Sequence, residues 1–171
     1  GSGKFPQALV AYANIAGASI QAIDYALLDP SGFSISEARK ALKLPFRAGA
    51  EYQSKLQELE YGSGPFDIVW ATHALYAVPV TELMAALEKM VNVISAGCPD
   101  DNKGVGFIAH ASAESHYIEF FKYYLSGFKQ NIGTPYISSE QILSILNKMG
   151  LKPEVQQVSY VNTAPQTSER K

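Results

Sequence analysis

Three stretches of this chain carry side chains that could bind or activate a small molecule. The first contains Asp29, which follows an apolar run at 23–28 and precedes Pro30 and Ser31. A carboxylate at the end of a strand can accept two hydrogen bonds from the vicinal hydroxyls of a ribose. An Asx turn in front of Pro30 would explain the same residue without a ligand. The glycine-rich start of the chain, upstream of Asp29, favours the ribose interpretation.

That start reads Gly1-Ser2-Gly3 and stands directly before a predicted helix. Glycine lets a backbone approach a ligand closely, and the N-terminus of a helix is electropositive. The three residues are therefore a candidate loop for an anionic or polar cofactor. Gly-Ser-Gly is also a common linker composition, which is the alternative interpretation.

The second stretch runs from Thr72 to Tyr76 and follows the clearest strand pattern of the chain. A neutral imidazole at His73 could hold a substrate amine, the edge of a cofactor or a proton. A loop histidine that only packs or caps is the alternative.

The third stretch contains His110, Glu114 and His116, at the end of the next predicted strand. Their spacing matches no zinc pattern and no further ligand is evident, so we predict no metal site. We expect His110 and Glu114 to form a polar wall of a substrate pocket. The aromatic residues that follow, such as Tyr117, are expected to be core, although one ring could contact a cationic amine.

Strand and helix patterns alternate along the chain. We expect strands at 23–28, 46–48, 66–72, 105–110 and 154–161. We expect helices at 6–16, 35–42, 51–61, from Pro79 to about Gly97, at 114–125 and after Ser138. Ser34 with Glu37 and Ser138 with Gln141 have the spacing of a capping box. Alternation of this kind requires crossover connections and predicts a three-layer α/β fold with a mostly parallel, Rossmann-like sheet between helices.

The carboxyl ends of parallel strands meet at one edge of such a sheet, where ligands bind. This rule would bring together the segments 1–5, 29–34, 72–78 and 110–116. We expect residues 1–162 to form one domain and residues 163–171 to form a polar tail.

Composition excludes several other classes of protein. The 171 residues are 47% hydrophobic and 18% charged, which is typical of a packed globular domain. Fourteen basic and sixteen acidic side chains give a net charge of −2, so we expect neither nucleic acid nor an anionic membrane as a partner. The single cysteine and the lack of an apolar leader predict a cytoplasmic protein. The chain does not start with Met, and we expect it to be part of a longer one.

The residues of these stretches resemble the class I S-adenosylmethionine-dependent methyltransferases. Gly1-Ser2-Gly3 resembles their cofactor loop, Asp29 resembles the acidic residue that holds the ribose, and residues 66–76 resemble the fourth strand with its following loop. More narrowly, the chain is similar to the histamine N-methyltransferase-like group. That narrower similarity rests on the stretches 29–31, 51–55, 66–78, 136–139 and 146–151.

The resemblance implies methyl transfer from S-adenosylmethionine to a small nucleophile, with an amine as the acceptor suggested by the narrower group. It implies catalytic roles for His73 and Tyr76. The cofactor site that it implies consists of Gly1, Ser2, Gly3, Asp29, Pro30, Ser31, Ala50, Glu51, Thr72 and His73. The acceptor would face Tyr76, His110 and Glu114.

The chain also departs from the family's pattern. The pattern shows neither the strand before the glycine loop nor, unless the tail supplies it, the last strand of the sheet, so we expect exposed strand edges. Association with itself or with the rest of a parent chain would cover them. His73 replaces a glutamine of the family and Ala77 replaces an aromatic residue, which argues against histamine itself. An imidazole at position 73 would also add a pH dependence that an amide lacks.

Two other functions fit parts of the pattern. The missing strands are compatible with a non-catalytic, methyltransferase-like interaction domain of a larger protein. A nicotinamide-dependent oxidoreductase would use the same kind of sheet, but its dinucleotide fingerprint is incomplete here because the third glycine is absent.

Overall fold

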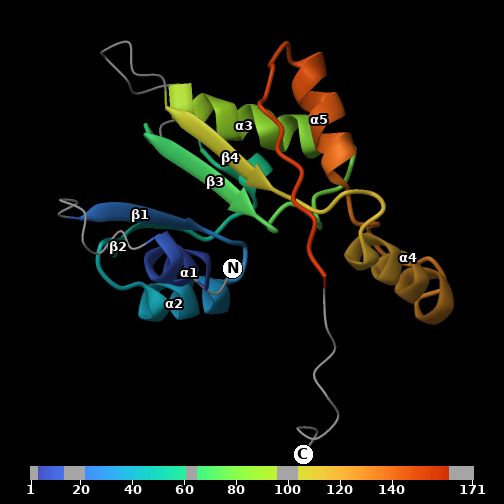
Figure 1. Cartoon of the computed structure of the whole chain (residues 1–171), viewed down its shortest axis with the longest axis horizontal. Helices are drawn as coiled ribbons and strands as arrows, with labels where there is room; N and C mark the ends of the chain where they lie inside the picture. Colours follow the sequence, from blue (N-terminus) through green and yellow to red (C-terminus); the bar gives the residue numbers. More distant parts are fainter. Residues whose placement is uncertain (1–3, 14–21, 61–64, 96–103, 162–171) are drawn as a thin grey trace, which may run out of the picture.

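The structure is a computed structural model that describes residues 4–13, 22–60, 65–95 and 104–161 (Figure 1). Helices and strands alternate along most of this length, as the sequence predicts. The elements are α1 (Lys4–Ala13), β1 (Ile23–Leu28), α2 (Gly32–Ala41), β2 (Phe46–Tyr52), the 3₁₀ turn η2 (Leu56–Glu58), β3 (Ile68–Thr72), α3 (Leu83–Ser95), β4 (Val105–Ala109), α4 (His116–Phe128) and α5 (Ser139–Lys148).

The first half of the fold is a β–α–β unit. Strands β1 and β2 pair in parallel, from Ile23 opposite Phe46 to Leu28 opposite Tyr52, and α2 connects them. A small core of Leu27, Ile35 and Ala38 joins α2 to β1. Helix α1 lies beside α2 in Figure 1. The Gln7 side chain on α1 donates a hydrogen bond to the Ala41 carbonyl at 2.9 Å.

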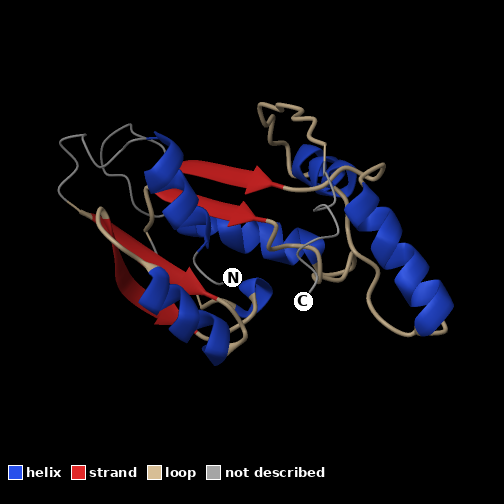
Figure 2. Cartoon of the chain, turned by 60° about the horizontal axis from the view of Figure 1, so that its bottom comes forward, coloured by secondary structure: helices blue, strands red, loops and turns tan. Residues whose placement is uncertain are grey.

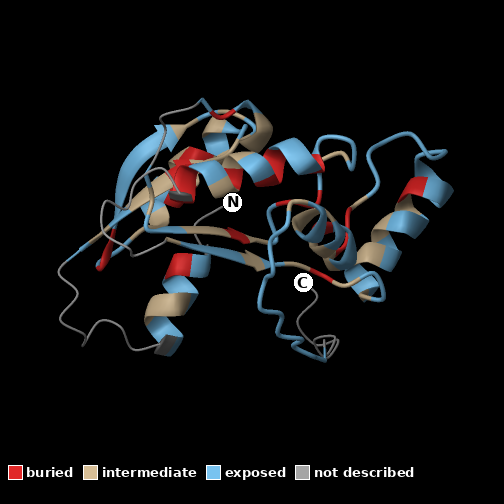
Figure 3. Ribbon diagram, turned by 90° about the horizontal axis from the view of Figure 1, so that it is seen from above, coloured by how far each residue is buried: buried red, intermediate tan, exposed pale blue. Residues whose placement is uncertain are grey.

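The second half repeats this plan with a larger core. Strands β3 and β4 pair in parallel, from Ile68 opposite Val105 to Thr72 opposite Ala109. Helix α3 connects them and packs against α5. Leu83 and Leu87 on α3 are almost fully buried, together with Ile137 before α5. Figure 3 shows the buried residues along α3 and a largely exposed α4.

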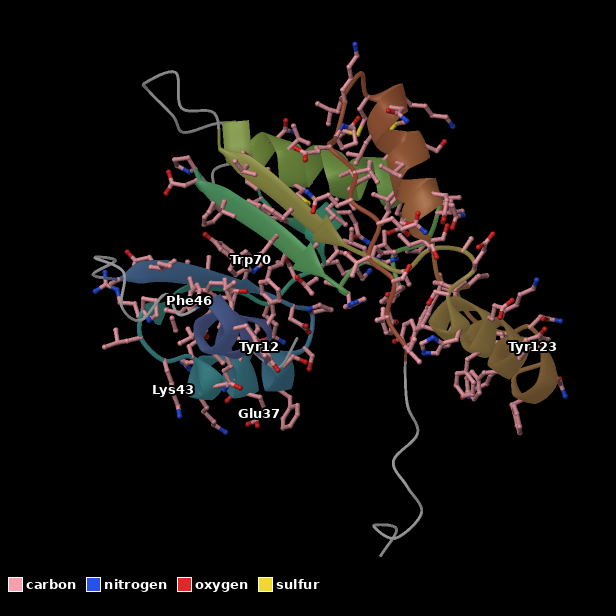
Figure 4. All side chains as sticks on the ribbon, viewed as in Figure 1. Tyr12, Glu37, Lys43, Phe46, Trp70 and Tyr123 are labelled. Carbon is pink, nitrogen blue, oxygen red and sulfur yellow. The ribbon has the colours of Figure 1, made fainter. Side chains whose placement is uncertain are left out.

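The two pairs of strands form two short sheets instead of the single sheet that the sequence predicts. Within the described ranges, no strand pairs with the facing edges of β1 and β3, so the ladder does not continue across them. Side chains bridge the two halves instead. The Trp70 indole N–H donates to the Tyr25 hydroxyl at 2.5 Å, and Phe5 packs edge-on against Trp70. Figure 4 shows Trp70 between β3 and β1.

One face of the β3–β4 sheet packs against α3, and the opposite face is open. Ile68, Val105 and Phe107 share the open face by register, and each is at least half exposed. Helices on both faces of a continuous sheet were expected, and the part of the chain that is described covers this face incompletely. Exposed strand edges and an apolar face match the expectation of an incomplete sheet.

The predicted helix at 51–61 is wrong. Strand β2 extends to Tyr52, well beyond the short strand expected at 46–48, and only the 3₁₀ turn η2 follows it. The cause is tertiary, because β1 provides a parallel partner along the whole of β2. The ladder continues to the Tyr52 carbonyl, which accepts from the Asp29 backbone N–H at 3.2 Å. Strand pairing therefore overrides the helical spacing of the apolar residues.

The predicted helix starts are partly correct. Helix α5 has the predicted capping box, in which the Ser138 backbone N–H donates to the Gln141 side chain at 2.9 Å. Helix α2 begins three residues earlier than predicted, and its cap is Ser31, whose hydroxyl accepts from the Ser34 N–H. Ser34 is therefore inside the helix and does not cap it. Helix α4 starts at His116 with Ser115 as its cap.

The predicted strand at 154–161 is also wrong. Residues 151–161 are exposed and form no regular element. Within the described residues this segment pairs with no strand, so its alternating pattern finds no partner. The predicted helix ends near residues 16 and 97 lie outside the described residues, as do Gly1-Ser2-Gly3 and the tail at 163–171. None of the helices described is long and apolar enough to span a membrane.

Candidate functional site

All four strands point toward the same end of the molecule, as the arrows in Figure 2 show. The loops after β1, β2, β3 and β4 therefore leave the two sheets on one side. This edge carries the described candidate residues in the loops that start at 29, 73 and 110, with Ala50 and Glu51 near the end of β2.

Asp29 directly follows β1 and shapes the turn into α2. Its Oδ1 accepts a hydrogen bond from the Ser31 backbone N–H at 2.8 Å, which makes the Asx turn that the sequence allowed. Ser31 then caps the helix, and Pro30 between them is exposed. The carboxylate is partly exposed at this edge, where it could also accept bonds from a ligand. The turn and the ribose roles of Asp29 are therefore compatible.

Ala50 and Glu51 lie on β2, one strand away from Asp29. Glu51 is opposite Leu27 in the parallel register, and both Ala50 and Glu51 are exposed. The Glu51 carboxylate forms an ion pair with Arg39 of α2 at 3.2 Å. Asp29 thus follows one strand and Ala50 and Glu51 lie on its neighbour, whereas three other expected cofactor residues, Gly1, Ser2 and Gly3, lie outside the described residues.

His73 occupies an unusual backbone position directly after Thr72, the last residue of β3. Its φ is +51°, a left-handed conformation that is uncommon for residues other than glycine. Two hydrogen bonds hold it there. Its backbone N–H donates to the Ala109 carbonyl at 2.9 Å, and its ring Nδ1 lies 2.6 Å from the Tyr76 hydroxyl. Strained backbone that is held in this way is more frequent at functional sites than elsewhere.

Tyr76 is the centre of an aromatic cluster, which we define as His73, Tyr76, His110, Tyr117 and Tyr136. Its ring lies 4.0 Å from the His110 ring, 4.8 Å from that of Tyr117 and 5.1 Å from that of Tyr136, between centroids. The Tyr76 side chain is buried, and burial raises the pKa of its hydroxyl. The hydroxyl therefore keeps its proton near neutral pH and acts as a hydrogen-bonding group.

His110 is held by one ring nitrogen. Its Nε2 lies 2.9 Å from the Ile137 carbonyl, which can only accept, so Nε2 carries the proton. The other nitrogen, Nδ1, is buried and has no hydrogen-bond partner in the described structure. Burial lowers the pKa of His110. The ring is therefore neutral and packs against Tyr76, and its expected place in the wall of a substrate pocket stays a prediction.

Glu114 is exposed in the loop before α4, outside the aromatic cluster as defined above, and its expected role toward the acceptor stays a prediction. The carboxylate that organises this loop is that of Glu140, which accepts from the Ala113 backbone N–H at 2.9 Å. The sequence could have indicated Glu140, because this residue lies in the first turn of α5, just after the capping residue Ser138.

Two further members of the cluster were missed by the sequence analysis. Tyr136 was used only as part of the stretch 136–139 and was given no site role, and Tyr117 was expected to be core although its side chain is 42% exposed. Tyr136 stacks on Phe121 of α4 with 3.5 Å between ring centroids, which fixes its orientation. Aromatic spacing along 117–124 could indicate a helix face, but it could not show that Tyr136 would pack against that face. In the described residues there is no group of histidine, cysteine or carboxylate side chains that could hold a metal ion.

Comparisons with known proteins identify a shared fold. No family model matches the chain, and no curated protein matches it in sequence. Among solved structures, the chain is similar to the magnesium protoporphyrin IX methyltransferase from Synechocystis PCC 6803, which was crystallised with bound S-adenosylhomocysteine (SAH). The two chains are 15% identical, the match covers 86% of this chain and 71% of the other, and the TM-score is 0.51. The likeness shows that this chain shares the α/β fold of that structure.

Proposed function

We propose that this chain is the catalytic domain, or part of the catalytic domain, of an S-adenosylmethionine-dependent methyltransferase that acts on a small molecule. One observation carries the proposal. In a chain with the fold of a methyltransferase, the carboxyl ends of the strands carry Asp29 on one sheet and the strained His73 with Tyr76 on the other. A ribose-binding group and a polar, aromatic acceptor site on one edge are what the reaction requires.

The positions of these residues at the carboxyl ends of the strands lead to the roles that we propose for them. Asp29 would accept hydrogen bonds from the ribose, beside Pro30 and Ser31, and the backbone near Ala50 and Glu51 would flank the adenine. Thr72 and His73 would lie where cofactor and acceptor meet. The acceptor would face the aromatic cluster, and an amine is the acceptor that the sequence resemblance implies. S-adenosylmethionine would supply the methyl group as a sulfonium.

The reaction needs alignment more than acid–base chemistry. Methyl transfer is an in-line displacement at carbon, so the protein must hold the nucleophile behind the methyl group and exclude water. The buried ring of Tyr76 and the neutral ring of His110 provide an apolar boundary for this step. We propose a small-molecule acceptor because the net charge of −2 offers no attraction to nucleic acid.

A second candidate is a methyltransferase-like interaction domain without catalysis. The facing edges of β1 and β3 and the exposed Ile68 and Phe107 favour it, since such surfaces normally contact other protein. Under this alternative, a partner strand or a second copy would complete the sheets. An interaction domain need not bind S-adenosylmethionine, whereas a methyltransferase must, so cofactor binding distinguishes the two candidates.

Calorimetric titration with SAH tests the proposal. We expect saturable binding, and we expect Asp29→Ala to weaken it by roughly 1.5–3 kcal/mol, or about 10- to 150-fold, because a charge-assisted hydrogen bond has that value. Asp24→Ala is the matched control. Asp24 is an exposed aspartate near the start of β1, where it forms an ion pair with Arg47, away from the carboxyl ends of the strands. A wild-type chain that binds no SAH favours the interaction domain.

A further inference from the structure

The segment that follows α5 leaves that helix through a defined turn. Gly150 has a φ of +77°, a left-handed conformation that glycine adopts without strain. Its N–H donates to the Asn147 carbonyl at 3.0 Å, and the Leu151 N–H donates to the Leu146 carbonyl at 3.0 Å. These two hydrogen bonds form a Schellman motif, which ends the helix. Pro153 comes next, and a proline favours an extended backbone in the residue before it.

Residues 151–161, which we call the strap, run from this turn toward α4. In Figure 1 the strap passes the carboxyl ends of β3 and β4 on its way. Its far end contacts α4, because the Tyr160 ring meets the His116 ring edge-on, at 6.1 Å between centroids and 74° between ring planes. His116 is the first residue of α4. The strap is thus attached to α5 at its start and to α4 near its end.

Tyr160 also lies near the centre of the aromatic cluster. Burial raises the pKa of the Tyr76 hydroxyl most, and the charges of nearby tyrosines, Tyr160 among them, raise it further. Tyr76 itself is fixed, because its hydroxyl accepts from the Ala111 backbone N–H at 3.2 Å and lies 2.6 Å from His73 Nδ1. Tyr76 is buried and Tyr160 is exposed, so Tyr160 approaches the cluster from its solvent side.

The strap carries apolar side chains that the fold leaves in water. Val155, Val158 and Val161 are each more than half exposed. Exposed apolar surface that is gathered in one place often marks a binding site. The residues of the strap form no regular element and are exposed, and a segment with so few buried contacts opens at low cost. The strap therefore combines two fixed ends with a middle part that can move aside and return.

We propose that the strap at 151–161 closes the acceptor side of the proposed site and that Tyr160 contacts the bound acceptor. The inference rests on the proposed function and adds the part of the chain that covers the acceptor. Closing a site expels water from it, and the aromatic cluster bounds the acceptor from the inner side alone. The Tyr160 ring and the valines of the strap supply the outer boundary. Opening of the strap would admit the acceptor and release the product.

The first test locates the strap in the full, isotope-labelled chain without any ligand. We expect a nuclear Overhauser effect between the ring protons of Tyr160 and His116, whose edges face each other. His116→Ala should shift the backbone amides of residues 155–161. Tyr123→Ala is the matched control, because Tyr123 is another exposed aromatic residue of α4, and it should leave these amides unchanged. Absence of the Tyr160–His116 contact in the wild-type chain overturns the inference.

The second test uses indole as a neutral probe of the acceptor side, titrated by calorimetry into the chain saturated with SAH. We expect Tyr160→Ala to weaken indole binding about three- to tenfold, which is what the loss of an aromatic contact is worth. Tyr160→Phe should keep the affinity because it keeps the ring. Tyr123→Ala should leave indole binding unchanged. None of the three variants should alter the affinity for SAH, since the strap lies on the acceptor side.

The outcomes separate this inference from the proposed function. If the chain binds no SAH, the proposed function fails and the role of the strap fails with it, even where Tyr160 contacts His116. If SAH binds but indole does not, or if indole binds wild type and Tyr160→Ala equally well, the role of the strap alone is overturned. Equal weakening of SAH and indole by Tyr160→Ala also overturns it, and so does a dimer that Val158→Asp dissociates, because the strap would then pair with a second copy.

Discussion

The two halves of this molecule share a plan and differ in how firmly they are packed. In the β3–β4 half, Leu83, Leu87 and Ile137 are at most 2% exposed, and α5 adds a second helix to the core. In the β1–β2 half, the core consists of Leu27, Ile35 and Ala38, and Leu27 keeps 7% of its surface exposed. The same β–α–β topology therefore yields one well-buried unit and one with a thin core.

The difference matters for the site, because each half carries a different part of it. The aromatic cluster with His73 belongs to the well-packed half, whereas Asp29, Ala50 and Glu51 belong to the half with the thin core. The proposed acceptor side is thus held by packing in the chain itself. We expect the proposed cofactor side to gain most of its rigidity from a bound ligand, since a ligand stabilises the state to which it binds.

The largest expected effect is the loss of unfolding free energy when a buried leucine is replaced by alanine, and this loss should differ between the two cores. Leu→Ala in a protein core costs about 2–5 kcal/mol, depending on the cavity that remains. We expect Leu83→Ala to fall near the upper end and Leu27→Ala near the lower end, because Leu83 is fully buried and Leu27 lies at the border of a small core. Denaturant unfolding of both variants measures this. Equal losses would contradict the contrast between the halves.

A smaller loss of stability is expected when the contact that joins the two halves is removed. The Trp70–Tyr25 hydrogen bond joins β3 to β1, and a bond between neutral groups contributes about 0.5–1.5 kcal/mol. A double-mutant cycle with Trp70→Phe and Tyr25→Phe should therefore give a coupling energy of that size. Coupling near zero would mean that the two sheets are joined by other contacts.

The smallest expected effect is a change in the pH dependence of stability, and it comes from His110 in the well-packed half. Burial lowers the pKa of His110 from its usual value near 6.5, so the folded protein binds fewer protons there than the unfolded chain. The stability that depends on neutral His110 is therefore complete above about pH 7 and is lost as the pH falls through 6.5 toward the folded value.

His110→Gln should reduce this loss, since glutamine does not titrate and its amide can still donate to the Ile137 carbonyl. Each unit of pKa shift corresponds to about 1.4 kcal/mol, which sets the scale of the difference. Thermal unfolding of both proteins between pH 5 and 7.5 measures it. Parallel pH profiles would show that His110 is already charged in the fold or is equally solvated in both states.

Local patterns in the sequence predicted the elements whose partners are close in the chain. Strands β1, β3 and β4 were predicted within two residues, and the Ser138 capping box was correct, because apolar runs and caps act locally. The helix at 51–61 failed because its residues pair with β1, and the strand at 154–161 failed because the described structure gives it no partner. Both errors arise from pairing, which a local pattern does not contain.

The site was predictable to a similar degree. The loop rule selected Asp29, His73, Tyr76 and His110 from position alone, and the structure brings the last three together. Their hydrogen-bonding states could not be read from the sequence, because they depend on the Ala111 amide and the Ile137 carbonyl. Tyr136 joins the cluster through stacking on Phe121, a contact across a loop that no spacing indicates.

The most direct test of the account is an SAH titration of the ¹⁵N-labelled chain, monitored through its backbone amides. We expect saturable shifts at the carboxyl edge, at residues 29–32, 50–53 and 72–76, with little change along α3 and α5. Asp29→Ala should weaken the response without altering the rest of the spectrum. Absence of saturable shifts would contradict a methyltransferase site. So would shifts gathered at the pocket of about 250 Å³ between Pro6, Gln7, Val10 and Lys43, away from the strand ends.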